Sequence, residues 1–265
     1  MKISYNSEFL HGYTSLVERR GETAQMLMDF GVIVLDPNNV YQDNSSIDER
    51  CYMLGSGSAT VSVEGKNFEW QRDDRFEQAP WCISVPRTVE VTIKAKTRKT
   101  EILRIATLNS KDFSVKHFTP KDCENEARGA GTMQETSTRI VRTIFNFNNH
   151  PDSNLVVGEV VNVPGKWSSY PPHHHPQPEI YHYRFKPEQG FGLTCIGERP
   201  YKILDKDTIL IRDKEDHPQV SAPGYAMWYL WVIRHLLDNP YIDPEFTPEH
   251  IWVSTPEAPI WVPKL

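Results

Sequence analysis

The sequence predicts an all-β fold, either a sandwich or a barrel. Short runs rich in Val, Ile, Thr and aromatic residues recur between turn signals along the whole chain, and amphipathic helical patterns of useful length are scarce. The length of 265 residues allows one large all-β domain or two smaller ones, and it is sufficient to bury a sizeable core.

The predicted strands fall into two groups along the chain. Gly, Pro, Asn and Asp separate most of the runs, as is typical of short strands joined by turns. The first group comprises GVIVL (31–35), ATVSVEG (59–65), CISVP (82–86), VEVTIKA (89–95) and EILRIAT (101–107). The second comprises LVVGEVVNV (155–163), EIYHYRF (179–185), GLTCIG (192–197), TILIR (208–212) and YAMWYLWVI (225–233).

One short helix is also predicted, together with a connection that precedes it. The run STRIVRTIFNF, from Ser137 to Phe147, has the best amphipathic pattern in the chain, and Ser137 could cap it. The polar, Gly-containing segment from Thr119 to Ser137 is typical of a connection and divides the chain into similar halves. We therefore predict two domains, 1–125 and 126–265, with a weak internal duplication.

Charge and cysteine content exclude several classes of protein. The net charge is −6 with 24% charged residues, so a basic surface for nucleic acid is not expected. The four cysteines lie far apart without a C-x-x-C spacing, which indicates reduced thiols. No stretch approaches the roughly 18 apolar residues of a membrane span, and the N-terminus has no apolar signal region, so we expect a cytoplasmic protein that binds no membrane.

A cluster of histidines in PPHHHPQPEIYHYRF is the strongest functional signal. Side chains two apart on a strand share a face, so His173 and His175 converge while His174 points the other way. A Pro-rich turn then brings Glu179 beside them at the start of the next strand. His217 lies between two later predicted strands, from which it can reach the same place.

Three histidines and one carboxylate suit a divalent metal ion, namely Zn²⁺, Mn²⁺, Fe²⁺, Co²⁺ or Ni²⁺, with positions left for water or substrate. The spacing does not choose among these metals. The alternative is a solvated polar loop or an adventitious nickel-binding run, because single histidines are more often surface or core residues than ligands.

The same residues resemble a known metal motif. The spacing H-x-H-x₃-E followed by a glycine resembles the first motif of the cupin superfamily, with His217 where the second motif supplies the last ligand; the matching positions are Gly165, His173, His175, Glu179 and Gly190. The stretches VVGEVVNVPGKWSSYPPHHH, EIYHYRF, PEQGFG and DHPQVSAPGYAMWYL resemble the 5-deoxyglucuronate isomerases of myo-inositol breakdown. Similarity in FGVIVLDPN, SGSATVSVEGKNFEW and VPRTVEVTIKA extends the resemblance over most of the chain.

The resemblance implies a bicupin, two jelly-roll β-barrels in one chain, whose second barrel carries the metal. It implies a metal-dependent aldose–ketose isomerase that converts an open-chain deoxy-uronic acid, 5-deoxy-glucuronate, into 5-dehydro-2-deoxy-gluconate. The related 4-deoxy-uronate isomerases of pectin breakdown share this plan. The metal would be held by His173, His175, Glu179 and His217.

Strand alternation and proximity to the motif supply candidates for the remaining roles. Tyr181 and Tyr183 share the face of Glu179 and are candidate acid–base or orienting groups, with aromatic packing as the alternative. The candidate substrate-binding residues are Lys166, Arg184, Gln189 and Tyr229. Their alternatives are solvation for Lys166, an ion pair across the barrel interface for Arg184, turn support for Gln189 and core packing for Tyr229.

Two departures from the family pattern concern the substrate. Trp231, in WYLWVIRH, stands where the family has Asn in YYLNVMAG. An acidic turn, with Asp213, Glu215 and Asp216, replaces Pro-Arg-Gly before the last histidine. A bulky indole and added negative charge near the mouth of the site are expected to change which substrate fits.

Other functions remain open at this stage. One is a cupin dioxygenase or epimerase acting on another small molecule, and another is a non-catalytic bicupin that binds a sugar acid. The expected partners are a small-molecule sugar acid and further copies of this chain, because the first barrel has no comparable ligand cluster and could instead form an oligomer interface. The aromatic tail, with Trp252 and Trp261, is expected to pack on a barrel or on a second subunit.

Overall fold

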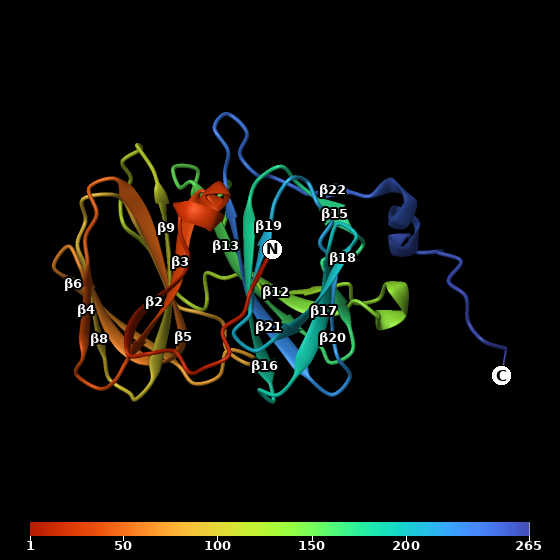
Figure 1. Ribbon diagram of the computed structural model, residues 1–265, viewed down its shortest axis with the longest axis horizontal. Coiled ribbons are helices and arrows are strands. Elements are labelled where there is room, and N and C mark those ends of the chain that lie inside the picture. The colour runs from red at the N-terminus through yellow and green to blue at the C-terminus, as the bar shows by residue number, and fades with distance from the viewer. Residues whose placement is uncertain (265) are drawn as a thin grey trace.

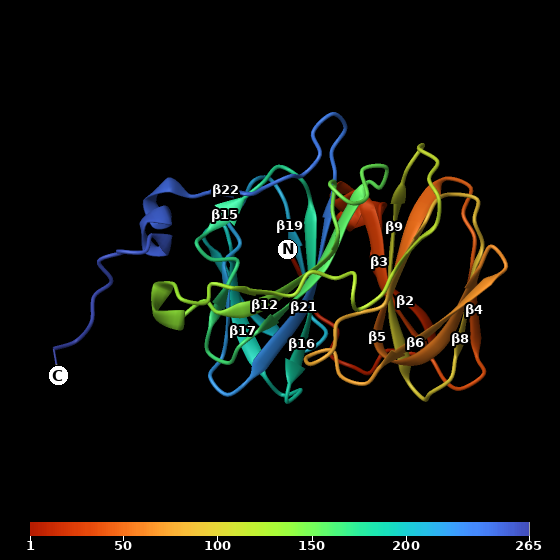
Figure 2. The ribbon, with the colours of Figure 1, turned by 180° about the vertical axis from the view of Figure 1, so that it is seen from behind.

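Two groups of strands, one from each half of the chain, form two barrels that lie side by side (Figure 1). The computed structural model describes residues 1–264. The first barrel runs from red to yellow, the second from green to blue, and the last residues extend away from the second barrel (Figures 1 and 2). The predicted all-β fold is confirmed.

The first barrel is built on a nine-stranded antiparallel sheet. Its main path is β10-β7-β5-β9-β3-β2, and the long strand β5 also pairs with β6 and β8, which continues to β4. A short 3₁₀ helix, η1 (Gly21–Met26), precedes β3. The strands are β2 (Gly12–Val17), β3 (Met28–Leu35), β4 (Val40–Asp43), β5 (Asp48–Val63), β6 (Lys66–Arg72), β7 (Cys82–Val85), β8 (Val91–Ala95), β9 (Thr100–Leu108) and β10 (Lys116–Phe118).

The second barrel combines a seven-stranded sheet, β1-β19-β16-β21-β13-β12-β11, with a four-stranded sheet, β14-β20-β17-β18. A two-stranded ribbon joins β15 to β22. The strands are β1 (Lys2–Ile3), β11 (Glu126–Arg128), β12 (Arg139–Phe145), β13 (Leu155–Asn162), β14 (Trp167–Ser168), β15 (His173–His174), β16 (Glu179–Lys186), β17 (Phe191–Ile196), β18 (Arg199–Leu204), β19 (Thr208–Ile211), β20 (Gln219–Ser221), β21 (Ala226–Arg234) and β22 (Glu245–Phe246), and the 3₁₀ helices are η2 (Met133–Glu135) and η3 (Pro248–Ser254). The division at residues 125 and 126 stays a prediction, and β1 pairs with β19 of the second barrel.

The helix predicted from Ser137 to Phe147 is wrong, because this stretch forms strand β12 between β11 and β13. Both faces of the strand are buried. Val141 packs into the interior of the second barrel, whereas Ile144 and Phe145 pack between the barrels. β-branched residues suit a strand that is covered on both sides, so tertiary packing overrides the weak helical pattern. The preceding connection also contains a strand, β11, and the helix η2.

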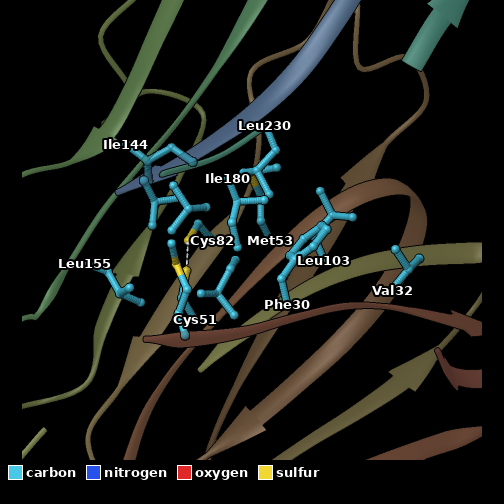
Figure 3. Close-up of a cluster of buried hydrophobic side chains, with 14 of the residues drawn as sticks. Phe30, Val32, Cys51, Met53, Cys82, Leu103, Ile144, Leu155, Ile180 and Leu230 are labelled. Atoms are coloured by element: carbon cyan, nitrogen blue, oxygen red, sulfur yellow. Dashed lines mark hydrogen bonds between the residues drawn. The ribbon is translucent and has the colours of Figure 1, made fainter. Parts of the chain in front are cut away.

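Three clusters of buried side chains make up the core. One fills the first barrel and one fills the second. The third lies between the barrels, where Phe30, Met53 and Leu103 of the first contact the region of Ile180 and Leu230 of the second (Figure 3). Strands such as β5 therefore send alternate residues to a barrel interior and to the junction, which explains their nearly continuous apolar sequences.

Buried ion pairs also join the two barrels. Glu159 on β13 accepts hydrogen bonds from Arg72 of the first barrel at 2.6 Å and from Arg142 on β12 at 2.8 Å. Arg184 on β16 donates to Glu101 of β9 at 2.6 Å, as expected for an outward-facing residue at the barrel interface. Because unpaired buried charge is costly, these contacts constrain how the barrels dock.

All four cysteines are free thiols, and the Sγ atoms of Cys51 and Cys82 lie 3.3 Å apart in the junction core (Figure 3). Trp252 and Trp261 are 47% and 81% exposed, so neither is buried against a barrel of its own chain, and the alternative of packing on a second subunit stays a prediction. Within residues 1–264, no helix has the length and apolar character needed to cross a membrane.

Candidate metal centre

The predicted ligands come from three neighbouring parts of the second barrel. β15 ends at His174, and the Pro-rich turn that follows carries His175 and leads to Glu179, the first residue of β16. His217 lies in the turn just before β20. Alternation along β16 directs Glu179 to the barrel interior, where the next inward residues belong to the interior core.

Three of the four predicted ligands form a compact buried group. His175, Glu179 and His217 offer ligand atoms that all lie within 4.8 Å of one another. Oε2 of Glu179 is 3.1 Å from Nε2 of His175 and 3.4 Å from Nε2 of His217. The ring of His173 lies beside that of His217, with 4.9 Å between their centroids, at the edge of the group.

The hydrogen bonds of the histidines determine which nitrogen each presents to the centre. Nδ1 of His173, His175 and His217 lies 3.1, 2.9 and 2.9 Å from the backbone carbonyls of Pro171, Gln177 and Glu215, respectively. A carbonyl oxygen only accepts, so each Nδ1 carries the proton and each neutral ring has a lone pair on Nε2. Backbone carbonyls commonly orient metal-binding histidines in this way.

The donor set therefore fits a divalent cation. Nε2 of His175 and Nε2 of His217 both face the same carboxylate oxygen of Glu179, so two imidazole nitrogens and one oxygen converge on one point. Nε2 of His217 is fully buried and has no hydrogen-bond partner within the described chain. Burial lowers the pKa of His217, and burial together with the nearby His217 lowers the pKa of His173 well below its usual value, so both rings stay neutral as metal ligands require.

His174 has a different role from its two neighbours. Its Nδ1 is 2.8 Å from Oδ1 of Asp216, and its backbone pairs with Glu245 of β22. Thr247 donates to the other oxygen of Asp216. His174 and the acidic turn thus fasten the segment around β22 beside the metal centre, and the ring points away from the ligands as alternation predicts.

A cavity opens over the cluster and leads outward. Its inner part, of about 80 Å³, is lined by His175, Glu179 and Tyr181. An outer part of about 560 Å³ extends towards the C-terminal segment. His173 and Trp231 line both parts, and the larger volume is in the range of sites for small molecules, roughly 300 to 1,000 Å³.

Trp231 forms a wall of this cavity because Gly158 leaves room for its indole. A Cβ built on Gly158 would lie 2.3 Å from the indole ring, so a larger residue there would displace it. Trp231 also stands opposite Tyr181 in the register of β21 and β16. The position at which the sequence departs from the family pattern is therefore at the cavity surface.

Of the two predicted catalytic tyrosines, Tyr181 reaches the cavity. Its hydroxyl lies 3.1 Å from Oγ of Ser169. The hydroxyl of Tyr183 lies deeper and donates to Oε1 of Gln219 at 2.7 Å. Burial raises the pKa of Tyr181 well above its usual value, with Glu179 adding to the shift, so the phenol stays protonated.

Three of the four predicted substrate-binding residues, Lys166, Arg184 and Gln189, do not line the cavity. The ammonium group of Lys166 contacts the backbone carbonyl of Glu135. Arg184 is used in the ion pair between the barrels, and Gln189 is exposed in a turn. Tyr229 does border the inner cavity, but its hydroxyl is 2.6 Å from that of Ser168.

The cations that do line the cavity are Arg128 on β11 and Arg139 on β12. Both fall in or next to the segment that the sequence predicted to be a connection and a helix. A strand prediction for 139–145 would have placed Arg139 and Val141 on one face, turned towards the barrel interior.

The chain is similar over most of its length to a known family and to named enzymes. The model of the KduI/IolB family matches residues 4–253. The chain is 28% identical to the 5-deoxy-glucuronate isomerase of Geobacillus kaustophilus (strain HTA426) over 244 residues, which cover 84% of each protein. It is 27% identical to the enzyme of the same name from Bacillus subtilis (strain 168) over 225 residues, 78% of this chain and 80% of the relative. These names confirm the predicted class of enzyme, an isomerase.

Solved structures confirm the cupin fold. An IolB-like protein from Salmonella typhimurium LT2 superposes with a TM-score of 0.84 at 22% identity and covers 95% of this chain and 98% of its own. The oxalate decarboxylase of Lactobacillus farciminis, in a formate complex, has a TM-score of 0.69 at 13% identity and covers 96% and 90%. With the family match extending across both barrels, the chain belongs to the KduI/IolB family.

Proposed function

We propose that the protein is a metal-dependent aldose–ketose isomerase that converts 5-deoxy-glucuronate into 5-dehydro-2-deoxy-gluconate in cytoplasmic inositol catabolism. The observation that carries the proposal is the buried group of His175, Glu179 and His217 at the inner end of a cavity, in a chain of this family. The substrate is taken from the names of the relatives.

The proposed ligands are His173, His175, Glu179 and His217, which would hold one divalent ion from the group of Zn, Mn, Fe, Co and Ni. The chemistry that such an ion would supply is polarisation of a carbonyl oxygen and stabilisation of negative charge next to it. The carbonyl acceptors of the three histidines hold their rings in place, so the ligand geometry is organised before substrate arrives.

Tyr181 is the proposed proton donor to the reacting oxygens. A chain of hydrogen bonds determines where the phenol proton of Tyr181 points. Tyr183 donates to Gln219, and the Gln219 amide donates to Ser169 at 3.3 Å. The Ser169 hydroxyl proton is then available to the oxygen of Tyr181, which leaves the phenol proton of Tyr181 for the cavity. The raised pKa of Tyr181 keeps the phenol protonated and excludes it as the base at neutral pH.

The test measures metal content and turnover in the same preparations. Purified protein should contain about one divalent ion per chain, as a single ligand set implies. It should convert 5-deoxy-glucuronate to the ketose, followed by NMR. His217→Ala should lose both the metal and the conversion. His11→Ala, an exposed histidine of the first barrel, should keep both.

Metal-loaded protein that leaves 5-deoxy-glucuronate and related deoxy-uronates unchanged would contradict the proposal. Oxygen uptake by iron-loaded protein would then indicate a dioxygenase, and tight sugar-acid binding without turnover would indicate a binding protein. We also propose a homo-oligomer, with the exposed tail around Trp252 and Trp261 at the contact. Light scattering of the full chain and of a chain ending before the tail tests this.

A further inference from the structure

Two arginines face each other across neighbouring strands at the cavity. Arg128 on β11 is the direct register partner of Arg139 on β12, and both side chains line the inner and the outer cavity. Like charges directly opposite one another destabilise a sheet. The arrangement therefore calls for a compensating negative charge.

Arg139 stands apart from the other buried arginines in lacking a carboxylate partner. The buried arginines Arg50, Arg72, Arg142 and Arg184 each have a carboxylate oxygen within 4.0 Å, at 3.9, 2.6, 2.8 and 2.6 Å, respectively. Arg139 is only 6% exposed, yet no carboxylate of residues 1–264 forms an ion pair with it. A buried guanidinium without an anion is costly, so this position is explained best by an anion supplied from outside the chain.

The hydrogen bonds of Arg139 leave part of its guanidinium group free for a ligand. Nη1 donates to the backbone carbonyl of Ser137 at 2.8 Å and approaches the hydroxyl of the same residue. Nε and Nη2 have no hydrogen-bond partner in the described chain. Neither atom is fully enclosed by protein. These donors are therefore reachable from the cavity, in the planar geometry that matches a carboxylate.

The neighbouring Arg128 already has a carboxylate partner, unlike Arg139. Arg128 forms a half-exposed pair with Glu126, with Nη2 2.6 Å from Oε2. The guanidinium group of Arg139 is therefore the one of the two that is left without a carboxylate in the described chain. Burial and repulsion from Arg128 lower the pKa of Arg139, and an anion bound between them would relieve the repulsion.

We propose that Arg139, assisted by Arg128, binds the carboxylate group of the substrate in the cavity that the ligand histidines also line. This inference deepens the proposed function and rests on it for the identity of the sugar acid. Binding of the acid group at the arginines directs the other end of the open chain towards Glu179 and its histidine partners. The site therefore selects sugar acids over neutral sugars of the same length, and it positions the carbonyl end for reaction.

The first measurement uses the wild-type protein loaded with metal and compares two probes by calorimetry. Glucuronate carries the carboxylate, and glucuronamide replaces it with a neutral group of the same shape. We expect glucuronate to bind about 10- to 100-fold more tightly, as is usual for a hydrogen-bonded charge pair. Equal affinities for the two probes would overturn the inference without the use of any variant.

The second measurement compares Arg139→Gln with Arg87→Gln, a matched change at a surface ion pair of the first barrel. Arg139→Gln should lose the preference for glucuronate, and its KM for 5-deoxy-glucuronate should rise by about 10- to 100-fold with metal content unchanged. Arg139→Lys should recover part of this loss. Arg87→Gln should match wild type in each assay.

The outcomes separate this inference from the proposed function. Turnover by wild type with an unchanged KM in Arg139→Gln would overturn the carboxylate site and leave the isomerase in place. Arginine-dependent binding of glucuronate without turnover of any deoxy-uronate would overturn the isomerase and leave the carboxylate site. If Arg139→Gln does not fold, the comparison of glucuronate with glucuronamide on wild type decides whether the cavity binds a carboxylate.

Discussion

Glu159 is predicted to be one of the most important single side chains for the docking of the two barrels. It is fully buried and accepts hydrogen bonds from Arg72 at 2.6 and 2.8 Å and from Arg142 at 2.8 Å. Glu159→Gln keeps the shape but removes the charge and turns an amide donor towards two guanidinium donors. Loss of one partner of a buried ion pair costs about 3 to 5 kcal/mol, a large part of the roughly 5 to 15 kcal/mol of a folded domain.

Urea denaturation followed by tryptophan fluorescence measures this free energy of unfolding. The matched control is Glu69→Gln, which removes the same charge from an exposed pair with Lys96, where the Glu69 side chain is 60% exposed. The control should lose no more than about 1 kcal/mol. If Glu159→Gln were no less stable than Glu69→Gln, the reasoning that the buried pairs hold the barrels together would be refuted.

Three further predictions concern pH, the β22 segment and the cavity wall. Burial raises the pKa of Glu49 from 4.5 to about 6, so the folded state holds this proton more tightly than the unfolded state. The free energy of unfolding should therefore fall by on the order of 2 kcal/mol as pH rises from 4.5 through 6. The difference in this free energy between wild type and Glu49→Gln should change over the same range, and a constant difference would contradict the prediction. His174→Ala should keep the bound metal but speed proteolysis after residue 236, because the bond to Asp216 is lost; loss of metal would instead make the ring a ligand. Trp231→Asn should change the ratio of KM values for 5-deoxy and 4-deoxy uronates at unchanged metal content, and identical ratios would exclude the indole from substrate selection.

The ligand cluster was accessible from sequence because it depends mostly on local spacing. His173 and His175 lie two residues apart and Glu179 follows after a short Pro-rich turn, so the period of a strand and the reach of one turn are enough to bring them together. His217 needed one further step, the expectation that an adjacent strand brings it to the same place, and the family resemblance implied the same position. The alternation along β16 that separates Tyr181 from its outward neighbours is equally local.

The binding surface around the cluster depended on contacts that are distant in sequence. Ser137 to Phe147 carries a helical pattern, and only packing on both faces makes it a strand. Lys166 is near the motif in sequence but contacts a backbone carbonyl, whereas Arg139 reaches the cavity through the pairing of β12 with β11 and β13.

The sequence by itself determined the all-β class and brought His173, His175 and Glu179 together as candidate ligands, because strand periodicity and one short turn act over a few residues. Only the tertiary structure decided which cations line the cavity and which charges pair between the barrels. Such choices depend on which strands become neighbours, and strand pairing is set by burial of the whole sheet and not by any short stretch of residues.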